Sequence, residues 1–130
     1  MSVLVKGLAF DWEGSDKAIT GIWPAVAIES AATQQTTTAN PAEKRNLRKP
    51  DIFSDAILSI LNAPPSLVNG QLLLDEDFLR QHASVSDFSR YSLVPGAVPR
   101  RIMPRILPDL SVAEQADEGK HYSGVTKPKL

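Results

Sequence analysis

The segment that most restricts how this chain can fold is a short apolar run that stops at a proline. Residues 18–23 read AITGIW, and their β-branched and aromatic side chains suit a buried strand of a parallel sheet. Pro24 cannot donate a hydrogen bond to a sheet, so the strand has to end before it. The loop beyond is small and apolar until Glu29 and Ser30. Because open α/β sheets bind ligands where loops leave the carboxyl ends of their strands, we expect a binding site here.

A second strand and further helices are predicted from the hydrophobic pattern. Residues 71–74 (QLLL) follow an Asn-Gly turn and form another apolar run, which favours a second buried strand. Helical spacing of apolar residues predicts amphipathic helices over 2–13 and 51–62, the first with a stripe of Leu4, Val5, Leu8 and Trp12. Acidic residues begin a short helix over 75–82, where they suit the helix dipole better than a metal ion. With a helix at its start and no strand before it, the chain is expected to begin in the middle of a larger α/β fold.

Two segments lack a pattern of regular structure. Residues 34–48 are polar and have no apolar period, so we expect a loop that is either a mobile lid or a solvated connector. Residues 97–130 contain repeated prolines together with Arg100, Arg101 and Arg105. These prolines oppose sustained helix or sheet and predict an extended or disordered tail.

Composition argues against several classes of function. The formal net charge is −1, which gives no indication of a nucleic-acid partner or an anionic membrane surface. The chain has no cysteine, which excludes disulfides and thiolate metal sites. No apolar run approaches the ~20 residues of a membrane span. His82 and His121 have no carboxylates at metal-ligand spacing, so no metal site is predicted.

Four stretches of the chain, in order and spacing, resemble a known family. They are AITGIWPAVAIESAAT, RKPDIFSDAILSIL, NGQLLLDEDFL and DFSRYSLVPG. Together they look like the C-terminal part of a short-chain dehydrogenase/reductase, most closely the hydroxysteroid dehydrogenase-like branch, with its Trp-Pro after the sixth strand. The resemblance covers residues 1–96. It implies an α/β fold that is a C-terminal fragment of a Rossmann-type doubly wound parallel sheet: two parallel strands with covering helices, followed by the irregular tail.

The resemblance also assigns roles to the loop after the first strand. It matches the family's Pro-Gly loop, which packs on the nicotinamide of NADP or NAD, with Ala25 in place of the usual glycine. Trp23 then lies either at the edge of the substrate pocket or in the core, and residues 34–48 match the substrate lid. The cofactor-binding residues implied are Pro24, Ala25, Val26, Ala27, Ile28 and the nearest hydroxyl, Ser30.

The family's catalytic motifs are not found in this sequence. It contains neither a Tyr-x-x-x-Lys nor a Gly-x-x-x-Gly-x-Gly run, so no catalytic residue is assigned and binding of the coenzyme by this chain alone is not expected. One hypothesis is a segment of an NAD(P)(H)-dependent oxidoreductase that acts on an alcohol or carbonyl of an apolar substrate. The other is a non-catalytic remnant or interaction module. An open strand edge predicts poor solubility, a homo-oligomer or pairing with a full-length relative.

The last three residues resemble a targeting signal. Pro128-Lys129-Leu130 differs from a peroxisomal Ser-Lys-Leu address only at its first position. Since members of the hydroxysteroid dehydrogenase-like branch are often peroxisomal, the resemblance adds to this signal. The expected location is the peroxisome, with the cytoplasm as the alternative.

Overall fold

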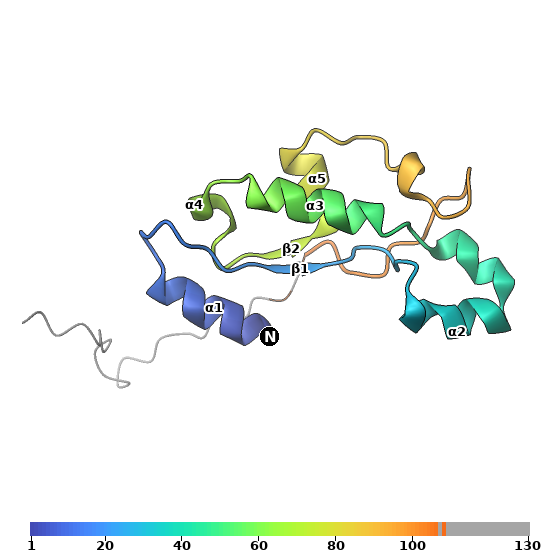
Figure 1. Cartoon of the computed structure of the whole chain (residues 1–130), viewed down its shortest axis with the longest axis horizontal. Coiled ribbons are helices and arrows are strands. Elements are labelled where there is room, and N and C mark those ends of the chain that lie inside the picture. Colours follow the sequence, from blue (N-terminus) through green and yellow to red (C-terminus); the bar gives the residue numbers. More distant parts are fainter. Residues whose placement is uncertain (107, 109–130) are drawn as a thin grey trace, which may run out of the picture.

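The structure is a computed structural model in which residues 1–106 and 108 are described. Two short strands lie at its centre, with helices on both sides of them (Figure 1). The helices are α1 (Ser2–Asp11), α2 (Ala31–Ala39), α3 (Asp51–Leu61), α4 (Pro65–Val68) and α5 (Asp75–His82), the strands are β1 (Gly21–Trp23) and β2 (Leu72–Leu74), and the 3₁₀ helices are η1 (Pro41–Asn46) and η2 (Ser89–Tyr91). The predicted strands and the three predicted helices are confirmed, with bounds that differ by at most three residues.

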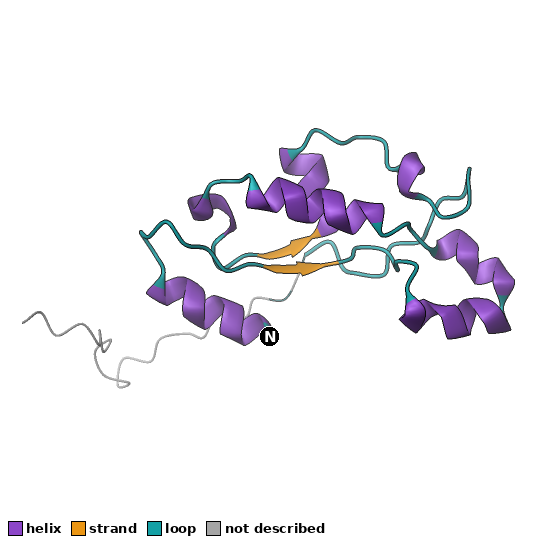
Figure 2. Cartoon of the chain, in the orientation of Figure 1, coloured by secondary structure: helices purple, strands orange, loops and turns teal. Residues whose placement is uncertain are grey.

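The two strands are parallel neighbours. Gly21 is paired with Leu72 and Trp23 with Leu74, and both strands point toward the end of the molecule where α2 lies (Figure 2). Helix α1 lies on one side of the strands and α3 on the other (Figure 1). This is the α/β arrangement of a Rossmann-type fragment, with helices on both faces of a parallel sheet.

The entry into β2 fastens α1 to the sheet. The side chain of Asn69 accepts a hydrogen bond from the backbone N–H of Ile19 at 3.2 Å and donates one to the carbonyl of Ala9 at 2.8 Å. The next residue, Gly70, has a φ of +72°, and a Cβ placed on it would lie 2.8 Å from the Cβ of Ala9. Glycine is therefore needed both for the turn and for the close approach of the helix.

The main core lies between α3, α5 and the segment around η2. Its buried members are Ile52, Ala56, Leu79, Phe88 and Tyr91. The partly buried Ile22 of β1 and Ile28 of the following loop pack against it. Both ends of the loop after β1 are thus tied to the core.

Residues 34–48 differ from the prediction of a loop, because α2 and η1 occupy most of them. At the start of α2, the backbone N–H of Ser30 donates to Oγ1 of Thr33 at 2.9 Å. Further along, the hydroxyl groups of Thr37 and Thr38 donate to carbonyls one turn earlier, at 3.2 and 2.8 Å. Hydrogen bonds of short polar side chains support this helix, so hydrophobic periodicity does not reveal it.

Helix α1 buries the predicted stripe in part: Val5 is buried and Leu8 and Trp12 are partly buried. Val5 and Ala9 are its buried residues, whereas Leu4 is 53% exposed. The close approach of Ala9 to Gly70 explains the difference, since only a small side chain fits there. The start of the predicted tail packs against the loop after β1, as described below, and the C-terminal tripeptide and His121 lie outside the described residues.

Candidate functional site

The candidate site begins with the loop that leaves β1 at the carboxyl end of the parallel pair. Ala25 is fully buried and Val26 is 2% exposed, while Ala27 and Ile28 are partly buried and Ser30 is exposed. Pro24 ends the strand as predicted, and it is partly buried. The part of the loop that is not fully buried therefore begins at Ala27.

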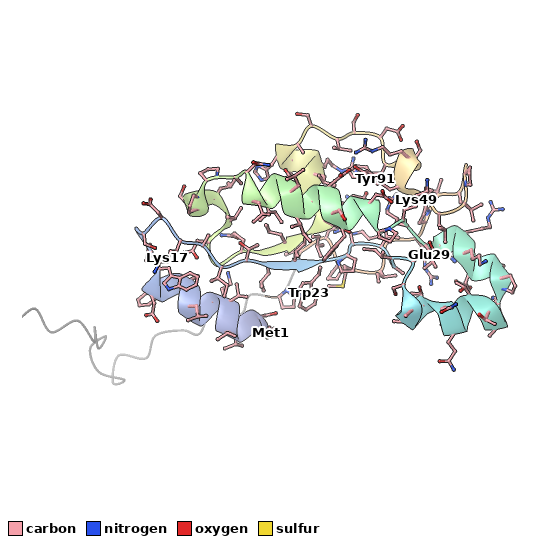
Figure 3. The ribbon with its side chains drawn as sticks, in the orientation of Figure 1. Met1, Lys17, Trp23, Glu29, Lys49 and Tyr91 are labelled. Atoms are coloured by element: carbon pink, nitrogen blue, oxygen red, sulfur yellow. The ribbon has the colours of Figure 1, made fainter. Side chains whose placement is uncertain are left out.

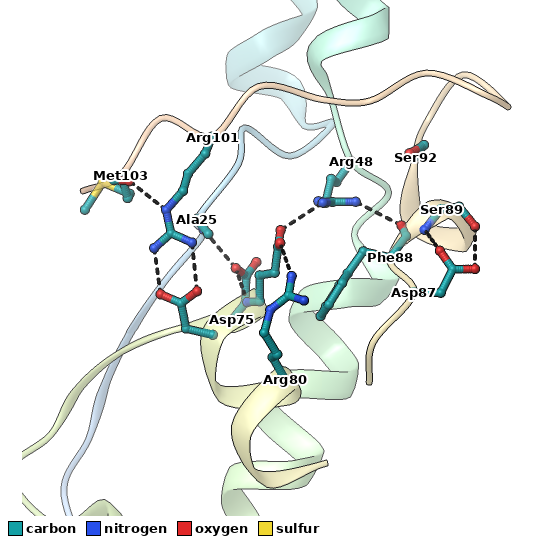
Figure 4. Close-up of polar contacts among 12 residues, drawn as sticks. Ala25, Arg48, Asp75, Arg80, Asp87, Phe88, Ser89, Ser92, Arg101 and Met103 are labelled. Atoms are coloured by element: carbon teal, nitrogen blue, oxygen red, sulfur yellow. Dashed lines mark hydrogen bonds and ion pairs between the residues drawn. The ribbon is translucent and has the colours of Figure 1, made fainter. Parts of the chain in front are cut away.

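A buried carboxylate at the start of α5 holds this loop. Oδ1 of Asp75 accepts hydrogen bonds from the backbone N–H of Ala25 at 2.8 Å and of Glu76 at 2.6 Å (Figure 4). Asp75 is 1% exposed, and its Oδ2 has no hydrogen-bond partner among the described residues. Burial raises the pKa of the Asp75 carboxyl above its usual value, and the two N–H donors offset part of this effect.

Arg48, at the end of the segment that was predicted as a lid, is hydrogen-bonded to Ala27 and Glu29, just before the start of that segment. We call these three residues the lid base. The backbone N–H of Arg48 donates to the carbonyl of Ala27 and its carbonyl accepts from the N–H of Glu29, both at 2.9 Å. Its guanidinium, whose side chain is 8% exposed, donates to Glu76 at 2.8 Å and to the carbonyl of Phe88 at 2.9 Å (Figure 4). The two ends of the segment are therefore fixed to each other, and α2 and η1 project from this base.

Two hollows adjoin α2. One, of about 490 Å³, is lined mainly by polar side chains, including Ser30, Thr33, Thr37 and Lys44. The other, of about 220 Å³, lies between α2 and the chain near residue 100. Its apolar lining residues are Ala27, Leu47 and Ile102, and its polar ones are Thr33, Thr36, Thr37, Glu43, Asn46 and Arg100. The second hollow reaches the loop after β1 at Ala27, and the first reaches it at Glu29 and Ser30.

Trp23 is 40% exposed and lies on the α1 side of the sheet (Figure 3). Trp23 is therefore not among the buried core residues of the described part of the chain. It does not line either hollow beside α2. Its assignment to a substrate pocket stays a prediction.

The arrangement brings together residues to which the sequence analysis assigned no role in the site. Asp75, Arg48 and Arg101 all have side-chain contacts around the loop after β1 or the lid base. An aspartate directly after an apolar strand was the available signal, because such a residue lies at the carboxyl end of the sheet. No comparable signal marks the two arginines, since their partners are distant in the sequence.

The residues present fit one end of a dinucleotide and not the other. Ala27 lines the smaller hollow and Ser30 the larger one, so there is space for a planar ring beside the loop. The carbonyl of Ala27 and the N–H of Glu29 are already bound to Arg48. No glycine-rich turn follows a strand in this sequence, so nothing here can cradle a pyrophosphate. Among residues 1–106 and 108, no group of three His, Asp or Glu side chains could hold a metal ion. In that same part of the chain, every helix is too short or too polar to cross a bilayer.

Comparison with solved structures relates this arrangement to dehydrogenases. The chain is similar to a short-chain dehydrogenase from Mycobacterium thermoresistibile, with a TM-score of 0.65 and 32% sequence identity over 78% of this chain. It is also similar to a protein from Xanthomonas campestris assigned as a dehydrogenase, with a TM-score of 0.63 and 30% identity over 88% of this chain. No protein-family model matches the sequence, and no curated protein matches it significantly.

The described part of the chain therefore has a short-chain dehydrogenase-like fold. The chain spans 35% of the first of these proteins and 38% of the second. The expected likeness to short-chain dehydrogenases is supported, while the hydroxysteroid dehydrogenase-like branch stays a prediction.

Proposed function

We propose that this chain forms the nicotinamide-side part of an NAD(P)(H)-dependent short-chain oxidoreductase of the hydroxysteroid dehydrogenase-like branch. The observation that carries the proposal is the loop of residues 24–30. It leaves a parallel strand at its carboxyl end, is held by a buried carboxylate and opens into a hollow beside α2. The similarity to short-chain dehydrogenases supports a role of this loop in binding a nicotinamide coenzyme.

In this proposal the loop receives the nicotinamide. Ala27, Ile28 and Ser30 supply the contacts, because Ala25 and Val26 are buried and act as their support. The bound coenzyme supplies the hydride acceptor or donor of the reaction. The sequence has no Tyr-x-x-x-Lys, so proton transfer is not assigned to any of its residues.

The apolar side of the smaller hollow supports the proposed substrate class. Its apolar lining of Ala27, Leu47 and Ile102 adjoins the nicotinamide loop and suits the hydrocarbon part of an alcohol or carbonyl compound. The α2–η1 segment lies over this hollow and acts as the substrate lid. A closed lid would exclude water from the hydride transfer.

A complementation experiment tests the proposal. The chain is mixed with the part of the M. thermoresistibile dehydrogenase that has no counterpart in it, and NADPH or NADH is titrated while the fluorescence of Trp12 and Trp23 is followed. We expect saturable binding by the mixture and none by either piece alone. Failure of the two pieces to associate, or association without nucleotide binding, would overturn the proposal.

A second candidate function is that of a non-catalytic interaction module. Large apolar side chains are exposed on both outer helices, with Leu58 60% and Leu61 75% exposed on α3, and Val3 71% exposed on α1. Such faces favour association with another chain. Sedimentation of the purified chain tests this candidate: a monomer at all concentrations contradicts it, and an assembly that the double variant Leu58→Glu/Leu61→Glu abolishes supports it.

The C-terminal Pro128-Lys129-Leu130 supports a further part of the proposal, a peroxisomal location. A fluorescent protein that carries the last residues of this chain should then accumulate in peroxisomes. Removal of Leu130 should leave the fusion in the cytoplasm, and an unchanged cytoplasmic signal in both fusions would contradict this location.

A further inference from the structure

Residues 97–103, which follow the last 3₁₀ helix, run across the loop that leaves β1. We call this segment the strap. Its near end is fixed by Ser92, whose Oγ donates to the carbonyl of Ala97 at 3.0 Å. Ser92 is 3% exposed and Ala97 is 7% exposed, so this attachment is shielded from water. The segment is therefore part of the folded structure despite its prolines.

The middle of the strap binds the backbone of the loop directly. The N–H groups of Ile102 and Met103 both donate to the carbonyl of Ala25, at 2.9 and 3.2 Å, and Arg101 forms an antiparallel bridge with Val26. The N–H of Ala25 is bound by Asp75. Both backbone groups of Ala25 are thus used within the chain, one by α5 and the other by the strap.

The far end of the strap is fastened by an ion pair with two hydrogen bonds. Nη1 and Nη2 of Arg101 donate to the two carboxylate oxygens of Asp77 at 2.7 and 2.6 Å, and Nε donates to the carbonyl of Met103 at 2.9 Å (Figure 4). The Arg101 side chain is 26% exposed and that of Asp77 is 30% exposed. A bidentate arginine–carboxylate pair fixes orientation as well as distance, which a single lysine contact would not do.

We propose that Arg101 is a positioning residue: it fastens the strap to Ala25 and Val26, the buried part of the loop of residues 24–30, and so fixes the conformation of the ligand-binding part from Ala27 onward. The role of the loop toward nicotinamide rests on the proposed function, whereas the fastening itself does not. The consequence is that nucleotide affinity depends on a residue that lies behind the loop rather than in contact with the ligand.

Amide hydrogen exchange of the purified chain, resolved by NMR, tests the fastening. In Arg101→Met, exchange of the Ile102 and Met103 amides should accelerate about tenfold or more, which is the effect of lowering an opening free energy by about 1.4 kcal/mol. Arg100→Met is the matched control. It removes the same charge from the neighbouring position, and Arg100 has no ion pair among the described residues.

The expected pattern is specific. Arg101→Lys should restore part of the protection, Asp77→Asn should reproduce the loss, and exchange of the Ile60 amide in α3 should change in none of these variants. Equal exchange in Arg101→Met and Arg100→Met, whether both are fast or both slow, would overturn the inference. Should Arg101→Met not fold, Asp77→Asn provides the same comparison with a side chain of nearly unchanged shape.

Nucleotide titration of the complemented assembly separates this inference from the proposed function. If both hold, Arg101→Met and Asp77→Asn weaken binding of NADPH or NADH relative to the wild-type assembly. If neither the wild-type assembly nor any variant binds nucleotide, the proposed function is wrong. The exchange data still show whether Arg101 fastens the strap. If Arg101→Met binds nucleotide as tightly as the wild type although the strap opens, the positioning role is overturned.

Discussion

Replacement of Gly70 by alanine tests how α1 is held against the sheet. Gly70 has a φ of +72°, which costs about 1–2 kcal/mol for a residue with a side chain. Its Cβ would also lie 2.8 Å from the Cβ of Ala9, closer than two carbon atoms can approach without movement. Displacing packed groups in this way costs a further ~1–3 kcal/mol. We therefore expect Gly70→Ala to lower the free energy of unfolding by about 2–5 kcal/mol.

Two other glycines separate the two contributions. Gly14 has a φ of +75° and nothing within 4 Å of the added Cβ, so Gly14→Ala should show the conformational cost alone, about 1–2 kcal/mol. Gly7 lies within α1 and also has nothing within 4 Å, but without a positive φ. Gly7→Ala should therefore stabilise the protein by about 0.5–1 kcal/mol.

Urea denaturation followed by tryptophan fluorescence gives the three differences in unfolding free energy. The decisive comparison is between the two glycines in the left-handed region. If Gly70→Ala is no more destabilising than Gly14→Ala, the close approach of Ala9 does not exist in solution. The described packing of α1 against Gly70, at the entry to β2, would then be wrong.

Three further changes test the candidate site and the core. The pKa of Asp75 is raised above its ordinary value of 3.8, so near and above that pH the folded protein binds more protons than the unfolded one. The contribution of Asp75 to the free energy of unfolding should therefore fall as the pH rises from about 3.8 through the folded-state pKa. Asp75→Asn should remove this fall, as measured by denaturation curves at a series of pH values. Arg48→Met should expose the lid base and speed tryptic cleavage after Lys44 and Arg45, and unchanged cleavage rates at these two sites would contradict the described role of its contact with Glu76. Tyr91→Phe removes a hydrogen bond of 2.6 Å to Asp55 and should lower the unfolding free energy by about 1–2 kcal/mol, as measured in urea.

The secondary structure of this chain was largely predictable where burial sets the pattern. The run that ends at Pro24 and the run after Asn69-Gly70 both form strands, because apolar β-branched or leucine-rich segments of this length suit a buried parallel pair. Helix α3 was equally clear from its apolar face. In these segments the local pattern and the tertiary environment favour the same structure.

The lid was not predictable in the same way. Helix α2 consists of AATQQTTTA, in which the threonines have low helix propensity and no apolar stripe exists. Its hydroxyl groups are hydrogen-bonded to its own carbonyls, and its start is fixed by the pair of Ser30 and Thr33. These hydrogen bonds form only once the backbone is helical, so they cannot be read from the sequence. Composition alone therefore predicts a loop here.

The polar contacts of the site escaped prediction for a different reason. The sequence shows acidic residues at the start of α5 but not what they bind, because Ala25 lies 50 residues from Asp75 and Arg48 lies 28 residues from Glu76. The dipole argument explains why carboxylates are favoured at this position. Only the fold decides which segments come within their reach.

The first turn of α5 holds three separate segments in place: the loop after β1, the lid base and the strap. Successive residues of a helix point about 100° apart, since one turn takes 3.6 residues, so Asp75, Glu76 and Asp77 face in different directions. The first binds the loop after β1, the second binds Arg48 at the lid base and the third binds the strap. These contacts differ in exposure: Asp75 is 1% exposed, whereas the pair that fastens the strap is about one quarter exposed. Salt screens exposed charges far more than buried ones, so rising ionic strength should release the strap first while the loop remains bound to α5.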